Sequence, residues 1–258
     1  TSLDVSANTN LVSIGNGFCR QCTSLTTVDN AGLCSLTTIG HSCFLACSAL
    51  IHLNLSELTS LESIGYSFCA ACSALKGVDA SGLSSVTSIG NSFLHGCKSL
   101  RSLDISHLAK LRYIGYNFCI ACTDLRDLNI SNTTNLISIE KEFCAGCTSL
   151  TSLNASGLVS LTTIGDEFLL FCSSLTHVSI AGMTALKTIG SAFCRECTSM
   201  VSIDASGLSS LLSIGTLFMY KCSSLVTVDV SGMSNITNIG GSFCRECTAL
   251  TQLRIVSS

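Results

Sequence analysis

Hydrophobic residues recur along the whole chain at a fixed interval of 25 residues, without an insertion or a deletion. Each repeat carries an isoleucine, a cysteine eight residues later, and a leucine or methionine three residues after the cysteine. The isoleucines are Ile14, Ile39, Ile64, Ile89, Ile114, Ile139, Ile164, Ile189, Ile214 and Ile239. A strict period of this length is typical of a solenoid, whose repeats stack on one another. We therefore expect ten in-register repeats that form a single domain over residues 1–258.

Two extended segments and one tight turn are predicted within each repeat. In residues 100–105 apolar and polar residues alternate at the end, so Leu103 faces the core and Asp104 faces solvent, as in a short strand. Residues 111–114 predict a second extended segment. Residues 117–122 space their apolar side chains like one tight helical turn.

Two rows of residues refine this picture. A phenylalanine recurs at one repeat position and predicts an aromatic spine, although Cys43 and Phe44 exchange places in the second repeat. A glycine follows the isoleucine in every repeat except one, where Glu140 stands. We interpret the glycine row as a turn that needs positive φ. A strained or relaxed turn is then expected at Glu140, at a cost of about 1 kcal/mol.

The string I-G-x-x-F-x-x-C-x-x-L-x-x-L resembles the BspA-type (Treponema-type) leucine-rich repeat over essentially the whole chain. The repeats depart from that family in a slightly longer turn and in S-G-L where proline is frequent. The resemblance implies a leucine-rich-repeat solenoid of α/β-type repeats, mostly strands and turns, with a parallel sheet. It also implies a surface-exposed protein without catalytic residues that adheres to other cells or to matrix proteins, and hence an extracellular or cell-surface location.

Composition and charge narrow the classes of partner that this chain is expected to bind. Hydrophobic residues are 47% of the chain and charged residues 11%, so a large core can be buried. The net charge of -3 gives no general attraction to nucleic acid or acidic membrane. No apolar run approaches the roughly 18 residues of a membrane span. We expect no nucleic-acid partner and no membrane insertion by this segment.

The 18 cysteines admit three interpretations: buried thiols, disulfides or metal ligands. Two of the six C-x-x-C pairs lie on adjacent repeats and could offer four thiolates to zinc. However, the first position of the pair is elsewhere Phe44, Leu94, Leu169 or Met219, as in an apolar core. Stacked strands hold Cβ atoms about 4.8 Å apart, too far for ordinary disulfides. We favour buried free thiols, without metal or cofactor. The pairs are Cys19/Cys22, Cys69/Cys72, Cys119/Cys122, Cys144/Cys147, Cys194/Cys197 and Cys244/Cys247.

A polar row follows the first strand of each repeat. Its carboxylates could share calcium, or its side chains could cap a turn by accepting a backbone hydrogen bond. Free exchange among aspartate, asparagine and serine favours the cap. The row is Asp4, Asp29, Asn54, Asp79, Asp104, Asn129, Asn154, Ser179, Asp204 and Asp229. Five N-x-S/T sequons offer candidate N-glycosylation sites, at Asn54, Asn129, Asn132, Asn154 and Asn235.

Basic residues gather in the middle of the chain. Three of them occupy one repeat position and should stack as a stripe on consecutive repeats, where like charges destabilise unless they serve a ligand. Arginine and tyrosine are also favoured at interfaces. The candidate ligand-binding residues are Lys76, Arg101, Arg126, Arg112, Tyr113 and Tyr116. The alternative is a solvated face with Asp124 and Asp127 as counter-charges.

The sequence thus favours a non-catalytic surface module that binds protein or glycan through its solenoid face. The five histidines form no catalytic grouping with serine and aspartate, which argues against an enzyme. The alternative is a structural spacer or a filament subunit that binds copies of itself end to end. It is motivated by ordinary strand motifs at both ends, at residues 3–5 and 253–256, where no polar cap is recognisable.

Overall fold

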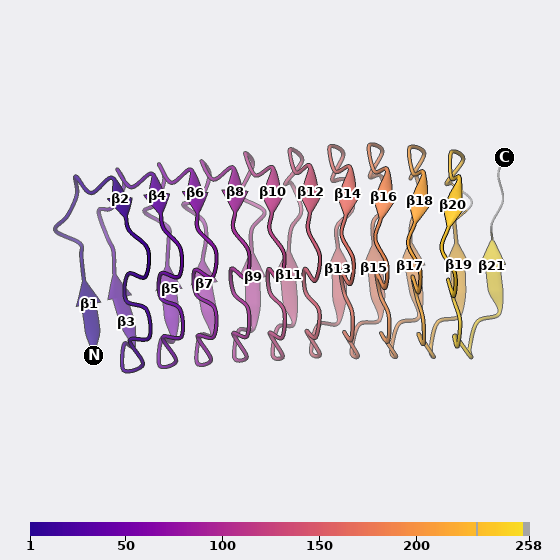
Figure 1. Cartoon of the computed structure of the whole chain (residues 1–258), viewed down its shortest axis with the longest axis horizontal. Coiled ribbons are helices and arrows are strands. Elements are labelled where there is room, and N and C mark those ends of the chain that lie inside the picture. Colours follow the sequence, from indigo (N-terminus) through magenta and orange to yellow (C-terminus); the bar gives the residue numbers. More distant parts are fainter. Residues whose placement is uncertain (231, 255–258) are drawn as a thin grey trace.

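The computed structural model describes residues 1–230 and 232–254. It confirms a leucine-rich-repeat solenoid of about ten turns, in which each repeat supplies one three-residue and one two-residue strand (Figure 1). Ile255 and Val256 of the last strand motif lie outside the described residues. The three-residue strands are β1 (Ser2–Asp4), β3 (Thr27–Asp29), β5 (His52–Asn54), β7 (Gly77–Asp79), β9 (Ser102–Asp104), β11 (Asp127–Asn129), β13 (Ser152–Asn154), β15 (His177–Ser179), β17 (Ser202–Asp204), β19 (Thr227–Asp229) and β21 (Gln252–Arg254). The two-residue strands are β2 (Ser13–Ile14), β4 (Thr38–Ile39), β6 (Ser63–Ile64), β8 (Ser88–Ile89), β10 (Tyr113–Ile114), β12 (Ser138–Ile139), β14 (Thr163–Ile164), β16 (Thr188–Ile189), β18 (Ser213–Ile214) and β20 (Asn238–Ile239).

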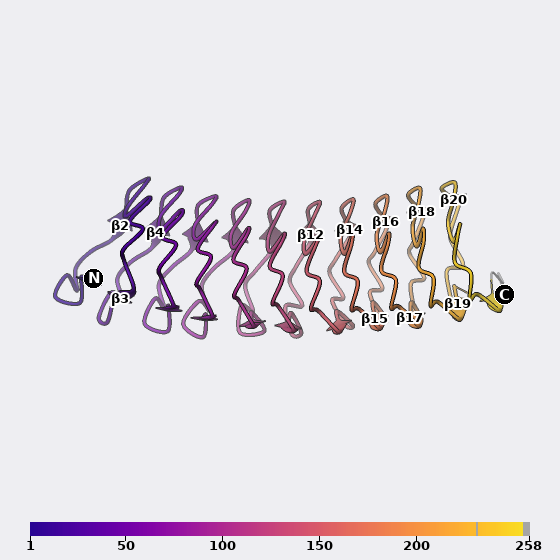
Figure 2. The same cartoon turned by 90° about the horizontal axis from the view of Figure 1, so that it is seen from below.

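The strands form two parallel ladders on the two sides of one core (Figures 1 and 2). The even-numbered strands make a continuous ten-stranded sheet, whereas the odd-numbered strands divide into β1–β3 and a nine-stranded sheet from β5 to β21. Each residue pairs with the residue 25 positions away, as Leu103 does with Leu128. Leu103 is 2% exposed and Asp104 is exposed, as the alternation predicted.

An aromatic spine runs through the core, as expected. From Phe68 to Phe243 each ring stacks on the next with centroids 5.0–5.5 Å apart. The exchange of Cys43 and Phe44 buries both side chains but turns the Phe44 ring edge-on, at 82° to Phe18 and 85° to Phe68. A small apolar cavity of about 20 Å³ borders these three rings.

The expected helical turn at residues 117–122 is wrong, and none of the described residues is helical. Asn117 and Ala121 instead have positive φ, 59° and 58°. Their N–H groups therefore point to the next repeat, where Asn117 donates to the Lys141 carbonyl at 3.0 Å and Ala121 to the Ala145 carbonyl at 2.8 Å. Hydrogen bonds between repeats replace most of the bonds that a helix would make within one repeat.

Positive φ does not explain the glycine row, so that interpretation is wrong. The nine glycines after the isoleucines all lie outside the left-handed region. Eight of them, all except Gly15, are required because neighbouring repeats approach closely: a Cβ on Gly65 would lie 2.6 Å from the carbonyl carbon of Gly40. Glu140 also lacks positive φ, and residues 141–144 form a bend without the hydrogen-bonded turn of the other repeats. The sequence expectation at Glu140 was a strained or relaxed turn; the turn differs there, but not because of positive φ.

The cysteine column has a specific structural role. Thirteen of the 18 cysteines are buried, and all are free thiols in this structure. From Cys47 to Cys247, each invariant cysteine donates its S–H to the carbonyl oxygen of the residue 28 positions earlier, at 3.0–3.2 Å. Because the acceptor is a backbone oxygen, the accepting residue can be cysteine, phenylalanine, leucine or methionine. The donating position, which we call the donor column, needs a small side chain that can donate a hydrogen bond, and cysteine meets this need.

Candidate binding surfaces

The predicted basic stripe forms at the start of three consecutive odd-numbered strands. Lys76, Arg101 and Arg126 directly precede β7, β9 and β11, and all three side chains are exposed. Their backbones are in register, because Arg101 N donates to the Lys76 carbonyl at 3.3 Å and Arg126 N to the Arg101 carbonyl at 2.9 Å. We call these three residues the basic row.

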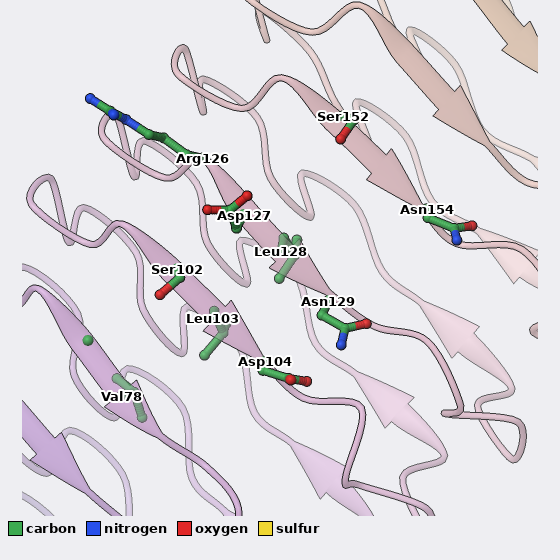
Figure 3. Close-up of a pocket in the computed structure, with 11 residues that line it drawn as sticks. Val78, Ser102, Leu103, Asp104, Arg126, Asp127, Leu128, Asn129, Ser152 and Asn154 are labelled. Atoms are coloured by element: carbon green, nitrogen blue, oxygen red, sulfur yellow. The ribbon is translucent and has the colours of Figure 1, made fainter.

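No carboxylate among the described residues lies within ion-pair distance of the basic row. The ion pairs of the described residues all lie elsewhere: Lys141–Glu142, Arg195–Glu196, Arg245–Glu246 and Arg254–Asp229. Asp124 and Asp127, the expected counter-charges, do not pair with the row. Figure 3 shows the Arg126 side chain extending beyond the start of its strand, away from Asp127.

A shallow hollow of about 500 Å³ lies beside the basic row on the odd-numbered sheet (Figure 3). It exists because the first residues of β7, β9 and β13 are small: Gly77, Ser102 and Ser152. Arg126 stands at one rim, and the polar row with Asp104 stands at the other. The surface therefore offers a cationic edge, small hydroxyl groups with the Asp127 carboxylate between them, and a polar far edge.

Among the described residues, eight of the ten members of the polar row, all except Ser179 and Asp229, are seen as turn caps, as the sequence favoured. Asp104 Oδ1 accepts a hydrogen bond from Ser106 N at 2.8 Å, and the same bond recurs in other repeats at 2.8–3.1 Å. The hydroxyl and N–H of Ser81 hold the pKa of Asp79 below its usual value, and Ser6 does the same for Asp4. Groups of three or more metal-ligating side chains are not found in the part of the chain that the structure describes.

Three of the sequence-predicted residues lie on the other face. Tyr113 belongs to β10, and the Arg112 guanidinium lies 5.9 Å from its ring centroid. Tyr116 follows three residues after Tyr113, with the Lys141 ammonium 5.9 Å from its ring centroid. The structure thus separates Arg112, Tyr113 and Tyr116 from the basic row by the thickness of the core.

An aromatic group on this even-numbered face escaped the sequence analysis. His41 and Tyr66 stack with ring centroids 3.9 Å apart, at 15°. Both occupy the position two residues after the isoleucine, which continues as Asn91, Tyr116 and Lys141. The shared repeat position of His41 and Tyr66 could have predicted their contact, because residues 25 apart become neighbours in a solenoid.

The remaining candidates are dispersed. All five sequon asparagines are exposed, but the Nδ2 of Asn235 donates to the Ser209 carbonyl at 2.7 Å. His52 and His177 begin β5 and β15 and are exposed, and His177 Nδ1 lies 3.0 Å from Ser202 Oγ. The described residues contain no helix long and apolar enough to cross a membrane.

The fold is similar to that of a solved leucine-rich-repeat structure. A leucine-rich repeat protein from Bacteroides ovatus is 19% identical and superposes with a TM-score of 0.58, over 96% of this chain and 77% of that one. A leucine rich cell surface protein from Faecalibacterium prausnitzii is 18% identical, with a TM-score of 0.46 over 94% of this chain and 82% of that one. A comparison with curated protein sequences found no match.

The family assignment comes from the sequence profile of the BspA type leucine rich repeat region. It matches in six copies, over residues 2–83, 58–176 and 137–258. Repeats of this kind are generally non-catalytic, and leucine-rich-repeat proteins typically bind protein partners. The chain belongs to the BspA-type leucine-rich repeat family.

Proposed function

We propose that this chain binds an acidic protein partner noncovalently through its odd-numbered sheet, as an adhesion module displayed outside the cell. The observation that carries the proposal is the basic row, three exposed cations on adjacent repeats without a carboxylate partner among the described residues. Like charges on neighbouring parallel strands repel one another. An anionic ligand would relieve this repulsion.

The hollow supplies a second element of recognition. A carboxylate-bearing segment lying along the solenoid axis would meet one cation about every 4.8 Å, the spacing of paired strands. The hydroxyls of Ser102 and Ser152 and the caps of Asp104 and Asn129 line the hollow beside that path. Cations would attract the ligand and speed association, while the hydroxyls and amides would orient it.

The test compares two triple variants with equal charge change. Lys76→Ala, Arg101→Ala and Arg126→Ala together remove the basic row. Arg20→Ala, Lys187→Ala and Arg245→Ala remove three exposed cations from elsewhere and serve as the control. The probe is a fluorescent oligoglutamate peptide, titrated by anisotropy at low and high salt.

We expect the row variant to weaken binding by about 3- to 150-fold, since three surface charge pairs are lost and each contributes about 0.2–1 kcal/mol. Its melting temperature should be unchanged or raised, because like-charge repulsion is removed. The wild type should lose affinity as salt screens the row. Equal binding by the wild type and the row variant would refute the proposal. Head-to-tail fibres in negative-stain images of the purified chain would instead favour end-to-end self-association.

A further inference from the structure

We propose that the even-numbered face carries a second, separate site, a slot between Tyr66 and Tyr116 that binds the pyranose ring of a neutral sugar. The two tyrosines occupy the same repeat position in the third and fifth repeats, and Asn91 lies between them in the fourth. Both tyrosines are exposed, at 48% and 42%, whereas Asn91 is half-buried. The short asparagine therefore leaves a gap above itself in a column of larger side chains.

The two rings face this gap. His41 covers the Tyr66 face on the side of the second repeat, so the free Tyr66 face points toward Asn91. The Lys141 ammonium of the sixth repeat lies 5.9 Å from the Tyr116 ring centroid, and we infer that the opposite face of this ring points toward Asn91. Tyr66 is held further by a hydrogen bond from its N–H to His41 Nδ1 at 3.2 Å.

The width of the slot suits one saturated ring. In the same three repeats, Phe68, Phe93 and Phe118 are spaced 5.5 Å apart at each step. Two such steps place the planes of Tyr66 and Tyr116 about 10 Å apart, allowing for strands about 4.8 Å apart. A ring centred between them would lie about 5 Å from each tyrosine, within the range of about 4.5–7 Å for ring contacts.

The slot is polar and uncharged on the side of Tyr66 and Asn91, whereas the Lys141 ammonium lies at the Tyr116 end. Asn91 Oδ1 accepts the hydrogen bond of Tyr116 N at 3.2 Å, while its Nδ2 group has no acceptor among the described residues. A hollow of about 310 Å³ adjoins Tyr66 and Asn91, and the hydroxyls of Ser63 and Ser88 line it. Its lining contains no aspartate, glutamate, lysine or arginine. The amide and hydroxyl groups can exchange hydrogen bonds with the equatorial hydroxyls of a sugar.

This chemistry favours a sugar over other ring-bearing ligands. A pyranose presents C–H groups on its faces, which pack on the negative face of an aromatic ring, and hydroxyls on its edge. An aromatic side chain of a peptide would leave the polar edges without partners, at a cost in affinity. The ammonium of Lys141 beside Tyr116 disfavours a cationic ligand.

The experiment titrates the purified chain with cellohexaose, maltohexaose and mannohexaose, in buffer free of glycerol and other sugars. Isothermal calorimetry and saturation-transfer NMR up to about 10 mM detect even millimolar dissociation constants. We expect at least one of these oligosaccharides to bind. Tyr66→Ala should weaken that binding by about 3- to 10-fold, the effect of one lost ring contact, while Tyr66→Phe should retain it.

Two further variants distinguish binding in the slot from non-specific binding to exposed tyrosines. Asn91→Tyr would fill the gap with a third ring in the same column and should abolish sugar binding without unfolding the chain. Tyr113→Ala removes a tyrosine of equal exposure outside the slot, at 47%, and should leave binding unchanged. The proposal is overturned if none of the three oligosaccharides binds, if Asn91→Tyr binds as well as the wild type, or if only an aromatic peptide such as acetyl-tryptophan amide occupies the site.

Discussion

The glycine row provides the most discriminating test of how the repeats pack. An alanine at position 65 would place its Cβ 2.6 Å from the carbonyl carbon and oxygen of Gly40 and 2.7 Å from the N–H nitrogen of His41. These are backbone atoms and cannot rotate away, so the two repeats must separate. Overpacking of this kind typically costs about 1–3 kcal/mol.

Gly15 offers a matched control within the same chain. It occupies the same repeat position in the first repeat, and a Cβ there would meet nothing within 4 Å. Neither glycine has positive φ, so alanine fits the backbone at both positions. We expect Gly15→Ala to be neutral or to stabilise by up to about 1 kcal/mol, because alanine restricts the unfolded chain.

The assay is thermal and urea unfolding of both variants, followed by circular dichroism. For a chain of this size about 1 kcal/mol corresponds to about 2–4 °C in melting temperature. Gly65→Ala should melt clearly below the wild type, and Gly15→Ala at or above it. Equal destabilisation by the two substitutions would refute close packing as the reason for the glycine row. It would indicate that the backbone conformation of the turn requires glycine.

Three further predictions concern single positions. Cys147→Leu should lower the free energy of unfolding by about 1–3 kcal/mol, because it overfills the core and removes an S–H donor. Cys144→Leu should cost less than about 1.5 kcal/mol. Comparable urea midpoints for the two variants would contradict the role of Cys147 as a hydrogen-bond donor. The pKa of Asp79 is depressed in the folded chain, so its cap stabilises above the unfolded pKa and loses that effect as the pH falls through the folded pKa. Asp79→Asn, produced in a host without N-glycosylation, should therefore show a smaller fall in melting temperature between about pH 5 and about pH 2, and an identical fall would be inconsistent with this cap. Asn117→Gly should raise the free energy of unfolding by about 1 kcal/mol, since Asn117 has a φ of 59° and a buried Oδ1 without a partner; a lower melting temperature would count against it.

Local and periodic features of the sequence were sufficient for much of this architecture. A 25-residue period without indels specifies stacking in register, and alternation within residues 100–105 specifies which side chains face the core. The turn caps and the basic row were predictable for the same reason. A cap such as Asp104 to Ser106 spans two residues, and equivalent positions of consecutive repeats must become neighbours.

Only the tertiary structure decided features that depend on distances between repeats. Gly65 is needed because Gly40 lies directly against it, and a glycine row alone cannot distinguish this close approach from positive φ. The helical spacing of residues 117–122 was misleading, because the N–H groups of Asn117, Cys119 and Ala121 bond to the next repeat. The division of the candidate residues between two faces, and the slot over Asn91, likewise depend on which way each segment turns around the core. These are contacts between atoms 25 residues apart, and their geometry is set by the packing of whole repeats, which no local pattern of residues encodes.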